Sequence, residues 1–327
     1  LTAPMTEFDF YAQLLPLVAQ VKDGHTNLAL SPPAIAHLDA QPVHFPFGLR
    51  FLGDKAYILR NLSSDPGIKD GAELLSIDGT AVMDIVPALL PLIPSDAGIR
   101  TARIRRLEYP VQFGRLLSLR FGAATSFRVR LRPFQGADVR EVTVPGVTAG
   151  ELIRTLRERY PATAERRPTY ELGFRGETAV LTVRAFAEDP DRTRPRYRDF
   201  VKEAFRSLDE KKAAGLIIDL RGNGGGHDEY AKLLFAHVMD RPFLYYAALE
   251  TKKDAYDLFK YTNETSQGRE ELAKQVRKNA LGRFDVIGHP NTGLQRPEEP
   301  RFAGRVAILI DGGSFSATGE TTSLFHY

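Results

Sequence analysis

Cysteine is absent from this 327-residue sequence, which excludes disulfides, zinc sites with thiolate ligands and cysteine nucleophiles. No apolar run approaches the roughly 18 residues that a membrane-spanning helix needs, so we expect no transmembrane segment. An excess of one charge is also missing, because 44 basic and 41 acidic residues leave a net charge of +3. So small a net charge does not indicate a nucleic-acid partner, and we expect none.

The composition that remains is typical of a folded, soluble protein. Hydrophobic residues make up 43% and charged residues 26% of the chain. Its length favours two domains plus an additional segment. The first ten residues, LTAPMTEFDF, show no basic stretch followed by an apolar one, so the sequence predicts no signal peptide.

The N-terminal region, residues 1–46, is expected to be a helical segment. Apolar residues recur at helical spacing over residues 7–22, and Thr6 and Asp9 resemble a capping pair at the start of that helix. An Asp-Gly turn signal follows the helix, in the segment DGHT (residues 23–26).

Residues 47–147 have the character of β-strands. Gly53 and Asp54 separate two short apolar runs and indicate a hairpin. Apolar residues alternate with arginines in FRVRLR (residues 127–132), which predicts a strand with one buried face, followed by a turn at residues 136–137. The arginine face could bind nucleic acid, but a solvated sheet face is the favoured interpretation.

Residues 148–327 alternate apolar strands with helices. Strands are expected in GLIIDL (residues 215–220) and RVAILI (residues 305–310), and residues 251–280 have helical character. Continuous apolar strands between helices predict an α/β fold with a largely parallel sheet covered on both faces. Ligand sites in such sheets lie beyond the carboxyl ends of the strands, so both strand ends are expected at one edge.

A glycine-rich turn follows the first of these strands. The segment LIIDLRGNGGGHDEY contains Gly222, Gly224, Gly225 and Gly226, whose N–H groups can point outward unobstructed by side chains. The turn could be a phosphate cradle, but the GxGxxG spacing is not met. It could equally supply an N–H group to an oxyanion hole, or be a tight turn without chemistry.

A serine follows the second strand, in VAILIDGGSFSATGE. Ser316 lies at the expected strand-to-helix turn, where its hydroxyl would be held at the sheet edge. The N–H groups of the first helical turn, including that of Ala317, are suited to stabilise an oxyanion. Ser316 could also be a plain helix N-cap.

Four segments of the chain, in this order, resemble the S41 peptidases, serine peptidases that include C-terminal processing proteases and the tricorn core protease. They are DGHT (23–26), GIKDGAELLSIDGTAV (67–82), LIIDLRGNGGG (216–226) and VAILIDGGSFSATGE (306–320). The second segment is similar to part of a PDZ-like domain. The resemblance implies a PDZ-like, mostly β domain over 47–147 and a ClpP/crotonase-like peptidase core over 148–327, without a cofactor.

The resemblance also implies roles for single residues. Ser316 matches the nucleophile, which attacks a peptide carbonyl and forms an acyl-enzyme. The N–H groups of Ala317 and Gly225 match the oxyanion hole, with Gly224 as the fallback. His25 matches the histidine base of tricorn-like members, and a free imidazole, with a pKa near 6.5, can accept the serine proton at neutral pH.

The identity of the base depends on which relatives apply. Lysine-type members pair the serine with a lysine further along the chain, whereas no lysine follows Ser316 before Tyr327, so we favour His25. Tricorn-like members also use a glutamate downstream of the nucleophile, which has no counterpart here, and the core is therefore expected to be incomplete at its C-terminus. Glu320 is either a supporting residue or an acidic residue favoured near a helix N-terminus.

The remaining histidines do not form a metal-binding set. His227 and Asp228 are adjacent at an expected helix start, but the sequence contains no HExxH motif, and we expect no metal. Asp219 and Arg221 flank the first strand end, where we expect an ion pair or turn hydrogen bonds rather than catalysis.

The sequence therefore predicts a serine endopeptidase of S41 type that acts on unfolded protein or C-terminal peptide segments. The alternative is a non-catalytic S41-like protein that binds a peptide or a lipophilic ligand, because the fold does not guarantee the activity. By resemblance to bacterial relatives, we expect export to the periplasm or cell envelope. The sequence decides neither the peptide preference nor the oligomeric state.

Overall fold

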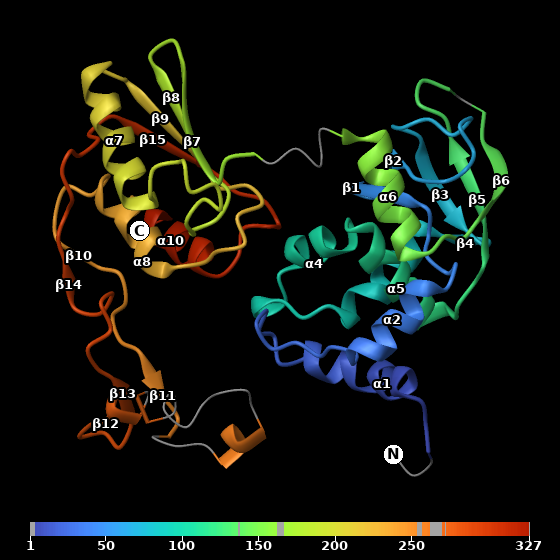
Figure 1. Ribbon diagram of the computed structural model, residues 1–327, viewed down its shortest axis with the longest axis horizontal. Helices are drawn as coiled ribbons and strands as arrows, with labels where there is room; N and C mark the ends of the chain where they lie inside the picture. The colour runs from blue at the N-terminus through green and yellow to red at the C-terminus, as the bar shows by residue number, and fades with distance from the viewer. Residues whose placement is uncertain are drawn as a thin grey trace. The chain divides into compact units, whose positions relative to one another are not determined.

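The computed structural model describes residues 4–136, 138–161, 167–253, 257–261, 270–271 and 273–326. The chain divides into two compact units, unit 1 (Leu1–Arg167) and unit 2 (Pro168–Tyr327), and each is described by itself (Figure 1). Within the described residues, no helix is both long and apolar enough to cross a bilayer.

Unit 1 contains an antiparallel sheet with the strand order β1-β2-β3-β5-β6, and β4 pairs with β3. The predicted hairpin at Gly53 is confirmed, since Leu52 pairs with Lys55 across a two-residue turn and Gly53 has a φ of 61°. The predicted alternation over 127–132 is also confirmed, with the apolar side chains buried. The strands are β1 (Phe47–Leu52), β2 (Lys55–Asn61), β3 (Glu73–Ile77), β4 (Thr80–Ala81), β5 (Ser126–Arg132) and β6 (Arg140–Pro145).

Helices pack against the buried face of this sheet in unit 1. The first begins where the sequence predicts, because the Asp9 N–H donates to the Thr6 hydroxyl oxygen at 3.1 Å. The helices are α1 (Glu7–Ala19), α2 (Pro32–Ala40), α3 (Val82–Leu89), α4 (Arg100–Leu107), α5 (Pro110–Phe121) and α6 (Ala149–Arg159), with short 3-10 helices η1 (Leu90–Leu92) and η2 (Asp96–Gly98). Helix α6 belongs to unit 1, although the sequence places a boundary at 148.

An aromatic cluster joins α5 to the sheet of unit 1. The ring of Phe45 lies 5.1 Å from that of Phe47 on β1 and 5.2 Å from that of Phe127 on β5, edge to face in both cases. Phe113 of α5 completes the cluster at 5.4 Å from Phe45. All four side chains are buried, so α5 is part of the hydrophobic core of unit 1.

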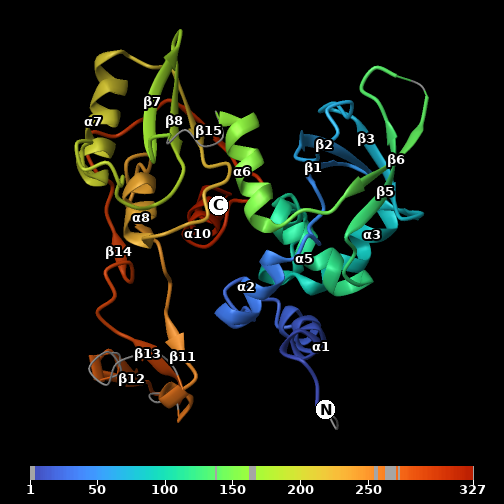
Figure 2. The same cartoon turned by 45° about the vertical axis from the view of Figure 1, so that its right-hand side comes forward.

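Unit 2 contains a four-stranded sheet in the order β15-β9-β8-β7. Strands β8, β9 and β15 are parallel, and β7 is antiparallel to β8, which confirms the α/β fold with a largely parallel sheet (labelled in Figure 1 and seen from another side in Figure 2). The strands are β7 (Tyr170–Arg175), β8 (Thr178–Val183), β9 (Gly215–Asp219) and β15 (Arg305–Leu309).

Three helices of unit 2, α7 (Tyr197–Glu210), α8 (Asp228–Ala236) and α10 (Ala317–His326), pack on one face of this sheet. The side chains that point to that face, such as Leu181 and Ile218, are fully buried. The opposite face carries Val180 and Ile217 and is only half-buried; it lines a cavity of about 490 Å³. Within the described residues, the expected helical cover is therefore found on one face.

The segment between α8 and β15 contains short strands together with short helical stretches, at 257–261 and among residues 270–274. β10 (Phe243–Leu244) pairs with β14 (Leu294–Gln295), and β13 (Phe284–Val286) lies between β11 (Glu250–Thr251) and β12 (Val276–Lys278). A 3-10 helix, η4, spans Asp257–Tyr261. The helical character predicted for 251–280 is wrong at β12, and part of that range lies outside the described residues, as does Ala137 of the turn predicted at residues 136–137.

Candidate active site

The two strand ends singled out in the sequence lie side by side. Because β9 and β15 are parallel neighbours, with Asp219 opposite Leu309, both leave the sheet at the same edge. The ladder continues one step further, since the Leu220 N–H donates to the Leu309 carbonyl oxygen at 2.9 Å. The glycine turn and the serine turn therefore begin next to each other, as expected.

Hydrogen bonds join these two turns along their length. Asp311 accepts from the Gly222 N–H at 2.8 Å, and the Ser314 hydroxyl donates to the Leu220 carbonyl at 2.8 Å. Further on, the Phe315 N–H donates to the Asn223 carbonyl at 3.0 Å. The hydroxyl of Ser314 is thus committed to the turn.

Gly225 lies directly against Ser316. A Cβ atom on Gly225 would lie 2.7 Å from the Ser316 Cβ, 2.8 Å from the Phe315 carbonyl oxygen and 3.0 Å from the Ala317 nitrogen. Gly225 also has a φ of 98°, which side chains rarely adopt. Only glycine fits at this position, and the backbone of the glycine turn consequently reaches the serine.

Ser316 occupies a left-handed backbone conformation, with a φ of 58°, immediately before α10. Such a conformation in a non-glycine residue is a source of strain and is found at strand-to-helix turns that carry a nucleophile. The Ser316 carbonyl accepts from the Glu320 N–H at 3.0 Å, so the residue caps the helix through its backbone. Ser316 is partly exposed, as a nucleophile must be.

The predicted oxyanion-hole donors differ in their surroundings. Ala317 is the first residue of α10, where N–H groups have no acceptor within the helix. The Gly225 N–H donates to the Asn223 side-chain oxygen at 2.9 Å, so an oxyanion at Gly225 would have to replace that acceptor. Gly224 is exposed, and a Cβ there would meet nothing within 4 Å.

Asn223 is a site residue that the sequence did not predict. Its side chain is fully buried, accepts from the Gly225 N–H and donates to the Val183 carbonyl at the end of β8 at 3.0 Å. Asn223 therefore holds the glycine turn on the neighbouring strand. The available signal was an amide side chain placed among glycines at a strand end.

The charged residues of unit 2 near these turns make structural pairs. Arg221 donates to Asp219 from two guanidinium nitrogens, at 2.9 and 2.6 Å, and these bonds hold the pKa of Asp219 below its usual value. This confirms the ion pair expected there. Glu320 accepts from the Tyr246 hydroxyl at 2.7 Å, and its role in catalysis stays a prediction.

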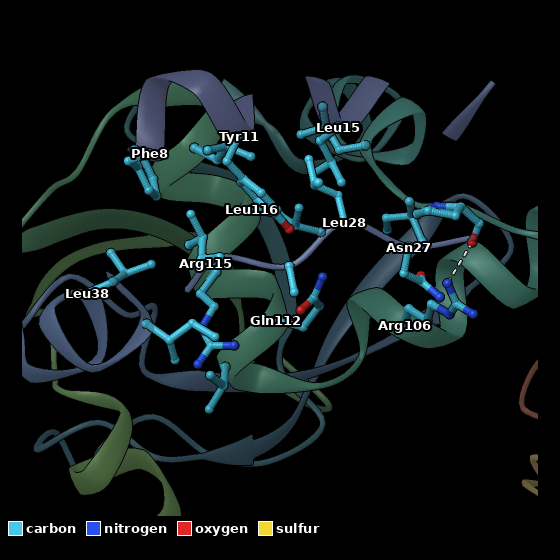
Figure 3. Close-up of a pocket in the computed structure, with 18 of the residues that line it drawn as sticks. Phe8, Tyr11, Leu15, Asn27, Leu28, Leu38, Arg106, Gln112, Arg115 and Leu116 are labelled. Atoms are coloured by element: carbon cyan, nitrogen blue, oxygen red, sulfur yellow. Dashed lines mark hydrogen bonds between the residues drawn. The ribbon is translucent and has the colours of Figure 1, made fainter. Parts of the chain in front are cut away.

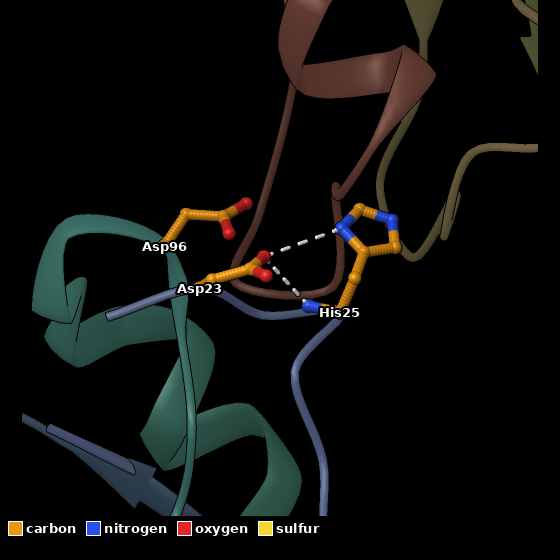
Figure 4. Close-up of side chains that lie close together, drawn as sticks. All are labelled: Asp23, His25 and Asp96. Atoms are coloured by element: carbon orange, nitrogen blue, oxygen red, sulfur yellow. Dashed lines mark hydrogen bonds and ion pairs between the residues drawn. The ribbon is translucent and has the colours of Figure 1, made fainter. Parts of the chain in front are cut away.

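His25 lies in a tight loop of unit 1 that Asp23 organises (Figure 4). Asp23 Oδ1 accepts from the His25 N–H at 3.0 Å and lies 3.7 Å from His25 Nδ1, and the Thr26 hydroxyl donates to Asp23 Oδ2 at 2.5 Å. The Thr26 hydroxyl and the His25 N–H lower the pKa of Asp23. His25 and Ser316 belong to different units, and their pairing stays a prediction.

One group of possible metal ligands occurs within the described residues. It comprises Asp23, His25 and Asp96, whose ligand atoms lie within 4.8 Å of one another (Figure 4). Both carboxylates already accept hydrogen bonds from this loop, since Asp96 Oδ1 accepts from the Gly24 N–H at 2.6 Å. The group is therefore explained as the framework of the loop, and the expectation of no metal stays a prediction.

Unit 1 also contains an apolar pocket of about 530 Å³ between its N-terminal helices and α5 (Figure 3). Its polar wall includes Arg106, whose guanidinium donates to the Pro94 carbonyl at 2.7 Å, and Arg115, which pairs with Asp39. Other lining side chains are Phe8, Tyr11, Leu15, Leu28, Leu38 and Leu116. Pockets of this size and character are suited to small apolar ligands.

Two solved structures share the fold of this chain. Mature CPAF is 16% identical, with a TM-score of 0.53, over 98% of this chain and 73% of that chain. A CPAF mutant is 14% identical, with a TM-score of 0.57, over 99% of this chain and 73% of that chain. At these identities, the likeness shows the fold alone.

One characterised protein and one family model also match the sequence of this chain. The carboxy-terminal processing protease CtpB of Bacillus subtilis (strain 168) is 32% identical over 108 residues, which cover 29% of this chain and 22% of CtpB. The shared part thus spans about a fifth of that relative. Residues 177–326, which include β8, β9, β15 and α10, match the family model of peptidase family S41. Residues 177–326 are therefore similar to peptidase family S41, over less than half of the chain.

Proposed function

We propose that the protein is a serine endopeptidase in which Ser316 is the nucleophile. The observation that carries this proposal is the approach of Gly225 to Ser316, which brings a glycine-rich backbone and the start of α10 to one partly exposed serine. The match of residues 177–326 to the family model of peptidase family S41 supports it. Strain at Ser316 supports it further, because strained backbone is concentrated at functional sites.

In the proposed reaction, Ser316 Oγ attacks the carbonyl carbon of the scissile peptide bond, and its proton passes to His25. The Ala317 N–H and an N–H of the glycine turn, from Gly225 or Gly224, stabilise the negative oxygen that forms. His25 then gives the proton to the leaving amine, and water hydrolyses the acyl-enzyme on Ser316. The Asp23 carboxylate, which lies beside the His25 ring, orients the base.

The substrate and the location belong to the same proposal. The name of CtpB describes a carboxy-terminal processing protease, and we extend the preference for C-terminal or unfolded segments to this chain. The antiparallel sheet and α3 of unit 1 support a PDZ-like domain over 47–147, which would bind peptide ends by strand addition. Export to the periplasm or cell envelope follows from the resemblance.

A fluorophosphonate probe tests the nucleophile, together with hydrolysis of an unfolded protein by the full-length enzyme. We expect labelling at Ser316 in the wild type and none in Ser316→Ala. Ser314→Ala is the matched control, because that hydroxyl is committed to the Leu220 carbonyl, and its labelling should persist. A folded wild type that neither reacts with the probe nor hydrolyses the substrate would contradict the proposal.

The alternative function, binding of a lipophilic ligand, has one observation in its favour, the apolar pocket of unit 1. Among the described residues, two arginines and no acidic side chain line this pocket, so an aliphatic carboxylate such as dodecanoate is the suitable probe. Calorimetric titration should show saturable binding that is lost when the pocket is filled in Ala29→Trp. Equal binding by both proteins would indicate surface adsorption and remove this alternative.

A further inference from the structure

We propose that Tyr246 is a positioning residue that ties the helix after Ser316 to the helix after the glycine turn. The Tyr246 hydroxyl lies 2.7 Å from Glu320 Oε2 and 3.0 Å from Asp228 Oδ2. This role deepens the proposed peptidase function and rests on it.

The two carboxylates belong to the two halves of the candidate site. Asp228 is the first residue of α8, which follows the glycine turn after the single residue His227. Glu320 lies in the first turn of α10, and its N–H donates to the Ser316 carbonyl at 3.0 Å. One phenol therefore contacts both helices at the ends that face the turns, where a small displacement would move Ser316 relative to Gly225.

A second, independent contact places this tyrosine. The Tyr246 N–H donates to the Asn291 carbonyl at 3.1 Å, and Tyr246 forms a β-bridge with Thr292. The preceding Tyr245 is buried and shares a 2.9 Å hydrogen bond with the Thr321 hydroxyl on α10. Both tyrosines thus hold α10, but only Tyr246 does so through carboxylates.

The charges at this contact determine how the activity of a Tyr246 variant should depend on pH. A phenol has one proton to donate, and here it lies between two carboxylates. Burial and the neighbouring Glu320 and Asp228 raise the pKa of Tyr246 well above its usual value, so the donor persists at every physiological pH. Among the described residues, Tyr245 and His289 are the other titratable groups whose rings contact Tyr246, and His289 Nε2 lies 3.6 Å from Asp228 Oδ2.

Without the phenol proton, the two carboxylates would repel each other at neutral and alkaline pH. A proton taken up by one of them at acidic pH would relieve this repulsion. Tyr246→Phe should therefore lower kcat by about 10- to 100-fold near pH 8 with little change in KM, and by clearly less near pH 6. A tyrosine that only fills space would give a deficit that does not change with pH.

Two further variants sharpen the test. Tyr245→Phe removes a hydroxyl that contacts α10 through the neutral Thr321, so any loss of activity should be the same at each pH. Glu320→Gln in the Tyr246→Phe background replaces one carboxylate by an amide that can donate to Asp228, and should recover part of kcat at high pH. A pH-independent deficit in Tyr246→Phe, or wild-type activity, would overturn the proposal.

Hydrogen exchange separates this proposal from the proposed function. The Glu320 N–H should exchange faster in Tyr246→Phe than in the wild type or in Tyr245→Phe, whether or not the protein cleaves peptides. If the wild type cleaves no peptide but the Glu320 N–H exchanges faster in Tyr246→Phe, the peptidase function is rejected and the positioning role of Tyr246 is retained. If the wild type cleaves peptides but exchange of the Glu320 N–H is unchanged in Tyr246→Phe, the positioning role of Tyr246 is rejected and the peptidase function is retained.

Discussion

Gly225 and Ser316 are so close that a single methyl group between them cannot be accommodated. A Cβ on Gly225 would lie 2.7 Å from the Ser316 Cβ, and the next two atoms it would meet belong to the backbone, the Phe315 carbonyl oxygen and the Ala317 nitrogen. Backbone atoms at a strand-to-helix turn cannot move aside as a flexible side chain can. The serine turn is therefore built around the absence of a side chain at residue 225.

Gly225→Ala should consequently lower the free energy of unfolding and abolish the reaction of Ser316 with the probe. The substitution imposes a positive φ on alanine and overpacks the turn, which together should cost about 2–4 kcal/mol of unfolding free energy. We expect a lower urea midpoint and no probe labelling at Ser316. Gly173→Ala is the control, because a Cβ on Gly173 of β7 would meet nothing within 4 Å. A reactive Gly225→Ala protein of wild-type stability would show that the two turns are further apart than described.

Asn223 should be the most sensitive polar residue of the glycine turn. Asn223→Ala leaves the Gly225 N–H and the Val183 carbonyl without their partner, at a cost of about 2–4 kcal/mol in urea unfolding. Asn223→Asp keeps the acceptor for Gly225 but buries a carboxylate against the Val183 carbonyl.

Burial should raise the pKa of the carboxyl group that Asn223→Asp introduces, and a protonated carboxyl can donate to Val183. Its stabilising form is therefore present at low pH and lost as the pH rises through that pKa. We expect the Asn223→Asp protein to gain stability relative to Asn223→Ala between about pH 7.5 and pH 5. Parallel pH profiles of the two variants would contradict this account.

Much of unit 2 could be predicted because its sequence signals are local. GLIIDL and RVAILI are continuous apolar runs, and such runs form parallel strands whose carboxyl ends share an edge. The convergence of the glycine and serine turns follows from that edge alone. The role of Asn223 could not be predicted, because it depends on a bond to Val183, 40 residues earlier, that only the folded sheet creates.

Less of unit 1 could be predicted from the sequence. Its hairpin at Gly53 is encoded by a local turn signal and was predicted, whereas α4 and α5 were not. Four of the eight residues of α4 are arginines, so its apolar stripe is weak, and Pro110 interrupts the helical pattern at the start of α5. What stabilises α5 is the packing of Phe113 on Phe45, a tertiary contact without a signature in the sequence.

His237 should make the stability of unit 2 depend on pH. Its ring is buried, stacked on Phe205 and 2.8 Å from the Pro300 carbonyl through Nδ1, and burial lowers its pKa. The unfolded chain then binds a proton more readily than the folded chain below about pH 6.5, so stability is lost as the pH falls through that value.

His237→Gln retains a donor for Pro300 but does not titrate. The difference in melting temperature between pH 7.5 and pH 5.5 should therefore be smaller in His237→Gln than in the wild type. His44 of unit 1 is also buried with a lowered pKa and remains in both proteins, so it cancels in this comparison. An equal or larger loss in His237→Gln would assign the acid sensitivity to other groups.

A substitution at Asp23 tests whether His25 is the base while leaving the imidazole in place. If His25 accepts the serine proton, labelling of Ser316 should rise with pH as the imidazole loses its proton, and His25→Ala should abolish it. The Asp23 carboxylate lies 3.7 Å from His25 Nδ1 and accepts from the His25 N–H at 3.0 Å. Asp23→Ala removes this acceptor, so the imidazole is no longer oriented and labelling of Ser316 should fall at every pH. Asp96→Asn is the matched control, since it keeps an acceptor for the Gly24 N–H of the same loop, and its labelling should persist. Wild-type labelling in Asp23→Ala, together with labelling in His25→Ala, would assign the base to a residue other than His25.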